Sequence, residues 1–176
     1  QLPISDDYQL KYNARIDENN SISIMAAGAS DSMAATFNEN HEEAVRDPDF
    51  AGPASIAQGF DSQGVTWDWK KNGKELTSIL SHTSSNDDFI YGKNQHEKTD
   101  TNRYMARIFY KQPLSDDHSL STGFSLSDIN YDMDFNAKLV ACNDLDPDCS
   151  TVDAEYVVYQ DTLTLFAYEF YVEDQW

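Results

Sequence analysis

The residues best suited to chemistry lie in one short acidic segment, CNDLDPDC, at residues 142–149. Asp144, Asp146 and Asp148 occupy every second position of this segment. That spacing can turn several carboxylate oxygens toward one hard cation, so calcium is the candidate metal. The segment lacks the glycine and the distal glutamate of an EF-hand loop. A solvated acidic loop is therefore the simpler interpretation, and the calcium site stands beside it as a hypothesis.

Two cysteines bracket these aspartates. Cys142 and Cys149 are separated by turn-forming residues, so a local disulfide between them is sterically plausible. Such a bond predicts an oxidising compartment, such as the periplasm or the cell surface. The alternative is two free thiols in a reducing compartment, which would leave reactive groups beside a polar loop.

Histidines offer a second kind of ligand group. His41 and His96 fall in segments that we predict to be long loops, and both are candidate contacts for haem or a metal chelate. The sequence His41-Glu42-Glu43 lacks the second histidine of a zinc-binding helix motif. Ordinary surface histidines are the alternative.

A basic stripe stands out in a chain with few positive charges. Arg103, Arg107 and Lys111 share the polar face of one predicted strand. They could line a path for an anionic ligand. They could equally pair with Glu169 and Glu173 on the polar face of another strand, which is the simpler structural interpretation.

Overall charge and missing motifs exclude several classes of function. With 31 acidic and 12 basic residues the net charge is −19, so nucleic acid is an unfavourable partner and cations or neutral ligands fit better. No segment resembles a nucleophile elbow, a phosphate-binding loop or a Ser/His/Asp array, so we expect no enzyme. No apolar run is long enough for a transmembrane helix.

The elements that position these residues are strands, because apolar and polar residues alternate with a period of two. Tyr104, Ala106, Ile108 and Tyr110, for example, share the face opposite the basic stripe. We predict an all-β fold, an antiparallel up-and-down meander of about seven strands over the whole chain. The segments with this signal are residues 8–16, 21–29, 63–69, 76–83, 103–111, 119–127 and 166–173.

Connections of two lengths alternate along the chain. Tight polar turns are predicted at residues 17–20, 71–74 and 113–117. Long loops are predicted near residues 30–55, 84–100 and 132–154, with a helical turn or two at residues 40–46. Short turns at one end of a sheet and long loops at the other are typical of outer-membrane barrels. Trp67, Trp69 and Tyr110 precede short turns, where an aromatic girdle is expected.

Several strands resemble those of TonB-dependent outer-membrane receptors, and the resemblance covers most strands but none of the loops. It implies a bacterial outer-membrane protein that takes up a scarce ligand, such as an iron chelate, cobalamin or an oligosaccharide. Its partners would be lipid, a plug domain and TonB, and neither the plug nor the TonB-binding segment is recognisable here. The resemblance rests on residues 7–11, 21–31, 62–69, 76–83 and 166–176.

The number of strands limits this hypothesis. Seven strands cannot close a transmembrane barrel, because bacterial single-chain barrels start at eight and transporters of this class use 22. The resemblance therefore implies a segment of a larger barrel. The alternative is a soluble β-barrel or sandwich, secreted or attached to the cell surface, that binds a small molecule, sugar, haem or calcium.

Overall fold

A computed structural model describes residues 3–46, 48–115, 117–138 and 154–176. The predicted Cys142, Cys149, Asp144, Asp146 and Asp148 lie outside these described residues. Among the described residues, no helix has both the length and the apolar character needed to cross a membrane.

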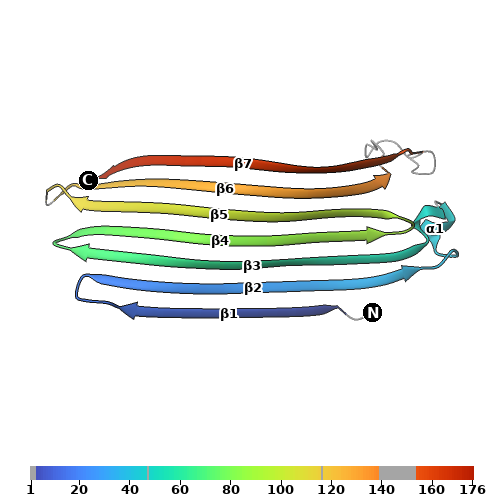
Figure 1. Ribbon diagram of the computed structural model, residues 1–176, viewed down its shortest axis with the longest axis horizontal. Helices are drawn as coiled ribbons and strands as arrows, with labels where there is room; N and C mark the ends of the chain where they lie inside the picture. The colour runs from blue at the N-terminus through green and yellow to red at the C-terminus, as the bar shows by residue number, and fades with distance from the viewer. Residues whose placement is uncertain (1–2, 47, 116, 139–153) are drawn as a thin grey trace.

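The described chain forms one open antiparallel sheet in which every strand pairs with its neighbours in sequence (Figure 1). The predicted all-β, up-and-down architecture is thereby confirmed. A short helix α1 (Glu42–Arg46) and a 3-10 turn η1 (Pro48–Phe50) lie between the second and third strands. The strands are β1 (Ile4–Arg15), β2 (Asn20–Phe37), β3 (Gly52–Lys71), β4 (Lys74–Tyr91), β5 (Gln95–Pro113), β6 (Ser119–Lys138) and β7 (Tyr156–Gln175).

The three tight turns lie together at one end of the sheet, on the left in Figure 1, as the sequence predicts. Asn72 and Gly73 connect β3 to β4 with φ angles of 52° and 76°, which is the conformation of a two-residue type I′ hairpin. In the turn before β2, the Asp17 carboxylate accepts hydrogen bonds from the backbone N–H groups of Asn19 at 2.7 Å and Asn20 at 2.9 Å. These bonds, the Asn19 bond first, lower the pKa of Asp17.

The strands extend further into the predicted loops than the sequence suggests. The prediction of a long loop at residues 84–100 is wrong. Strand β4 continues to Tyr91, residues 92–94 form a tight turn, and β5 begins at Gln95. Likewise β2 runs to Phe37, β3 begins at Gly52, and β6 runs to Lys138. Polar residues such as Asn86 form strands here because neighbouring strands on both sides complete their hydrogen-bond ladder.

No second layer covers this sheet among the described residues, so it has almost no core. The buried apolar side chains of the described chain are only Ala44, Ala51 and Ala137. Large apolar side chains are exposed instead, including Leu80 at 65% and Tyr168 at 76%. What the sheet presents on its two faces therefore decides what it can do.

Candidate functional site

The two faces of the sheet follow from strand alternation and from the register of pairing. We define face A as the face that carries the even-numbered residues of β4 and face B as the face that carries its odd-numbered residues. Across the sheet, one row of face A reads Tyr12, Ile24, Val65, Leu80, Ala106, Leu126 and Tyr168. The matching row of face B reads Asn13, Ser23, Thr66, Ile79, Arg107, Ser125 and Glu169.

An apolar band crosses all seven strands on face A, in the half nearest the short turns. On β7 it extends from Phe166 to Val172, and on β5 from Tyr104 to Tyr110. Trp67 lies within it, close to the β3–β4 turn, and its indole N–H donates to Asn20 at 3.1 Å. Aromatic side chains with a polar tip thus border the band on the side of the short turns, as the sequence predicts.

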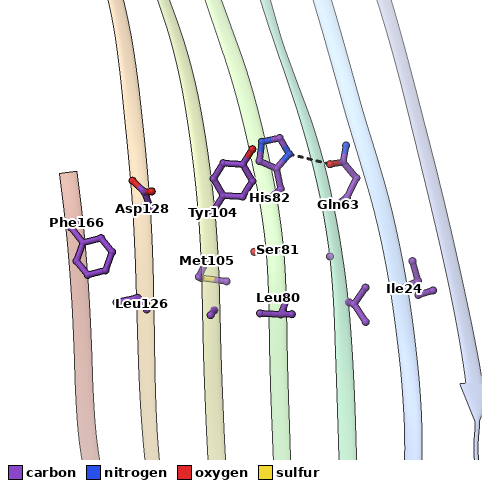
Figure 2. A pocket seen from close by; sticks show the side chains of 13 residues that line it. Ile24, Gln63, Leu80, Ser81, His82, Tyr104, Met105, Leu126, Asp128 and Phe166 are labelled. Atoms are coloured by element: carbon purple, nitrogen blue, oxygen red, sulfur yellow. Dashed lines mark hydrogen bonds between the residues drawn. The ribbon is translucent and has the colours of Figure 1, made fainter. Parts of the chain in front are cut away.

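A groove of about 480 Å³ lies in this band around Ala106 (Figure 2). The methyl group of Ala106 leaves a gap between Leu80 and Leu126, its neighbours on the adjacent strands. Phe166 lines the groove on β7 and Ile24 on β2. The walls are almost wholly apolar, so the groove suits hydrocarbon rather than a charged ligand.

A row of polar side chains borders the apolar band on the side away from the short turns. His82 Nδ1 lies 3.3 Å from Gln63 Oε1, and the imidazole stacks on Tyr104 with ring centroids 4.5 Å apart (Figure 2). Asp128 occupies the same row on β6. The buried His82 Nε2 has no hydrogen-bond partner among the described residues. This row marks where face A changes from apolar to polar.

Beyond that row, face A is acidic. The Tyr8 hydroxyl donates to Asp61, Lys98 pairs with Asp88 at 3.4 Å, and Thr162 donates to Asp132 at 2.6 Å. Further carboxylates in this half are Asp6, Asp100 and Asp134. These carboxylates lie on strands that project past the apolar band.

Face B has the opposite arrangement of polar and apolar side chains along the strands. In the half nearest the short turns it is mostly polar and carries the basic side chains, whereas its other half holds most of its aromatic and aliphatic side chains together with several carboxylates. The apolar residues of this second half are Met33, Ile56, Phe60, Phe89, Tyr91, Tyr131, Met133, Phe135, Val157, Tyr159 and Leu163. The pKa of the Tyr91 hydroxyl is raised, mainly because the group is partly buried.

The predicted basic stripe lies on face B, and each member has a neighbour there. Arg103 donates to Ser127 Oγ at 3.1 Å, and the Arg107 guanidinium lies 5.5 Å from the centre of the Phe109 ring. Lys111 donates to Gln175 at 3.4 Å. These three neighbours are neutral. Carboxylates also lie near the stripe on face B, because Glu75 is directly opposite Lys111 and Glu169 shares the row of Arg107.

The two predicted histidines lie in different settings. His41 is in the β2–β3 connection, with its ring centroid 4.6 Å from that of Phe37. His96 lies in strand β5 rather than in a loop, on face A, with Nε2 3.0 Å from Asp134 Oδ1. Among the described residues no group of three or more His, Cys, Asp or Glu side chains is placed to hold a metal ion.

An ion pair ties the β2–β3 connection to the far end of β6. Lys138 Nζ lies 2.5 Å from Asp49 Oδ2, and only 7% of the Lys138 side chain is exposed. The Asp49 carbonyl accepts from the Lys93 N–H at 2.7 Å, and the Gln95 side chain accepts from the Lys138 N–H at 3.2 Å. Residues 48–51 are thereby held against the turn between β4 and β5, at the end of the sheet where α1 lies in Figure 1.

Sequence reasoning missed the exchange of faces, although a signal exists. In β6, Phe124 and Leu126 are even-numbered whereas Met133 and Phe135 are odd-numbered. A change of parity within one unbroken strand moves its apolar side chains to the other face. The polar row and the Asp49–Lys138 pair have no such signal, because each joins residues that are distant in sequence.

Comparison of the chain with protein-family models, with curated proteins and with solved structures finds no match.

Proposed function

We propose that this chain forms part of the wall of an outer-membrane receptor that takes up a scarce ligand. In this arrangement the apolar band of face A meets lipid, face B lines the lumen, and the ends of the strands opposite the short turns project outside the cell. An iron chelate, cobalamin or an oligosaccharide would be the cargo. The resemblance of several strands to TonB-dependent receptors supports this assignment.

The observation that carries the proposal is a single-layered sheet with an apolar band on one face that no other described part of the chain covers. Phe166, Tyr168 and Phe170 are each at least 66% exposed. A protein in water rarely leaves a contiguous apolar surface of this kind open, whereas lipid is an ideal partner for it. The opposite side of the sheet at the same level is mostly polar and carries the basic stripe, with Ile79, Met105 and Phe109 among its polar side chains, which suits a water-filled lumen.

Strand length supports the same arrangement. The strands β3, β6 and β7 each have 20 residues. A tilted transmembrane strand needs only about 9–11 residues. About half of each strand would therefore lie in the bilayer. The apolar side chains change from face A to face B where that half ends. The polar row of Gln63, His82, Tyr104 and Asp128 would mark the outer boundary of the lipid.

The edges of the sheet indicate the remaining partners. The outer edges of β1 and β7 carry no strand among the described residues, and exposed edges of such length promote aggregation. Because seven strands do not close a membrane barrel, further strands would pair with both edges. The plug domain and TonB would complete the transporter.

A direct experiment is to refold the 176-residue chain with and without detergent or lipid vesicles and to measure its size and β-sheet content. We expect an ordered sheet only with detergent or vesicles, and precipitation in buffer. A monodisperse folded monomer in plain buffer would contradict the proposal and favour a soluble secreted or surface-attached β-module instead.

A further inference from the structure

The outer half of face B, which is the half farthest from the short turns, contains a second groove with a different character. This groove has a volume of about 390 Å³ and lies between the ends of β5, β6 and β7. Its walls are Met133, Phe135, Val157 and Tyr159. A groove of this size and lining can hold one small molecule with an apolar body.

Among the described residues, the charged side chains that face B carries around this groove are all acidic. Glu97 lines it directly, and Asp161 accepts a hydrogen bond of 3.0 Å from the Tyr159 hydroxyl at its margin. In the next strands of the same face, Asp31 and Asp87 occupy the row of Asp161. Lys98 contributes to the lining, but its ammonium lies on face A, where it pairs with Asp88 at 3.4 Å.

Basic side chains on face B are confined to the other half of the sheet. From the row across the sheet that contains Phe60 to the row that contains Tyr91, face B carries no lysine or arginine. The basic side chains of face B, including Arg103, Arg107 and Lys111, lie nearer the short turns. An anionic ligand would therefore be repelled from the groove, whereas a cation would be attracted by Glu97 and by the faces of Phe135 and Tyr159.

We propose that this groove binds an organic cation with a flat apolar body. The cationic group would lie against Glu97 and over the aromatic rings, and the apolar body would contact Met133 and Val157. The inference rests on the proposed function only in taking face B as the surface that a ligand meets, and it narrows the cargo to cationic molecules or cationic complexes.

Three small probes of similar shape test the sign of the charge. Benzyltrimethylammonium, benzyl alcohol and benzenesulfonate are cationic, neutral and anionic, and their binding to the 176-residue chain in nonionic micelles is measured by calorimetry, with micelles alone subtracted. We expect the cation to bind about fivefold or more tightly than the alcohol, since a cation–π contact and a nearby carboxylate both favour the charged probe. The sulfonate should bind weakest.

Variants locate the binding to this groove. Glu97→Gln should weaken binding of the cation about threefold and leave the alcohol unchanged. Phe135→Leu, which keeps the groove apolar but removes one ring, should also weaken the cation about threefold. Glu169→Gln, on the same face but near the short turns, is the matched control and should change neither, and circular dichroism checks that every variant keeps its sheet.

Equal affinity for the three probes, or equal losses in Glu97→Gln and Glu169→Gln, would overturn the inference. These outcomes are distinguishable from failure of the proposed function, which concerns face A. Charge-selective binding in a chain that does not contact lipid would refute the membrane assignment and leave the cation groove intact. Lipid contact without charge selectivity would refute the groove alone.

Discussion

The buried ion pair at the loop end of the sheet gives a prediction whose size can be worked out from the structure. Lys138→Met removes the ammonium and keeps most of the apolar stem. Asp49 then loses its ion pair with the Lys138 ammonium at 2.5 Å, in a position where 33% of its side chain is exposed. Breaking a buried pair from one side costs about 3–5 kcal/mol. Because water reaches part of Asp49, we expect about 1–3 kcal/mol here.

This cost should fall first on the connection between β2 and β3, because Asp49 lies in it. The Lys93 N–H is a suitable reporter, since it donates to the Asp49 carbonyl at 2.7 Å. A loss of 1–3 kcal/mol corresponds to exchange of that amide with deuterium about 5 to 150 times faster. Exchange in the middle of β3 should stay unchanged.

The matched control is the exposed pair between Lys98 and Asp88, with side chains 46% and 35% exposed. Lys98→Met should change exchange at Lys93 by less than about fivefold, because exposed pairs contribute about 0–1 kcal/mol. The double variant of Asp49→Asn with Lys138→Met should cost less than the sum of the single variants. Equal effects of Lys138→Met and Lys98→Met at Lys93 would refute the assignment of the pair as the anchor.

Three further predictions concern packing, pH and lipid contact. Gly123→Val should destabilise the β6–β7 pair by about 1–3 kcal/mol, since an added Cβ would lie 2.2 Å from the Tyr171 ring. Gly64→Ala is the control and should be tolerated, because the nearest contact of its Cβ would be 3.4 Å. Thermal melts of the two variants would measure these effects. The pKa of Asp17 is lower in the folded than in the unfolded state. The stabilisation by its carboxylate is therefore complete above the unfolded pKa and is lost as the pH falls through the folded pKa. The difference in melting temperature between wild type and Asp17→Asn should disappear at low pH. Leu80→Asp, in the apolar band, should reduce insertion into vesicles strongly, as a pull-down with sedimented vesicles would reveal.

Much of this fold could be predicted from the sequence because strand alternation and turn chemistry are local. Tyr104, Ala106, Ile108 and Tyr110 lie on the face opposite Arg103, Arg107 and Lys111, and Asn72-Gly73 is typical of a tight hairpin. The strand at residues 84–91 could not be predicted in this way. Ser84 and Asn86 have low intrinsic preference for strands and are held in the sheet by their neighbours on β3 and β5.

The candidate sites depend even more on contacts between distant residues. The row of Gln63, His82 and Tyr104 forms only when three strands take their observed register. His96 falls in the segment predicted as a long loop, residues 84–100, yet it lies in β5 beside Asp134. Loop assignments fail where charged side chains lie on strands that extend beyond the apolar band.

Lipid contact of face A is the central claim, and tryptophan quenching tests it most directly. Trp67 lies in the apolar band, so a variant with Trp69→Phe and Trp176→Phe reports from that face alone. Its partner variant adds Trp67→Phe and Thr66→Trp, which moves the probe to face B. In vesicles of lipids brominated on the acyl chains, we predict strong quenching for the first variant and little for the second. Equal quenching of both, or none of either, would contradict the account.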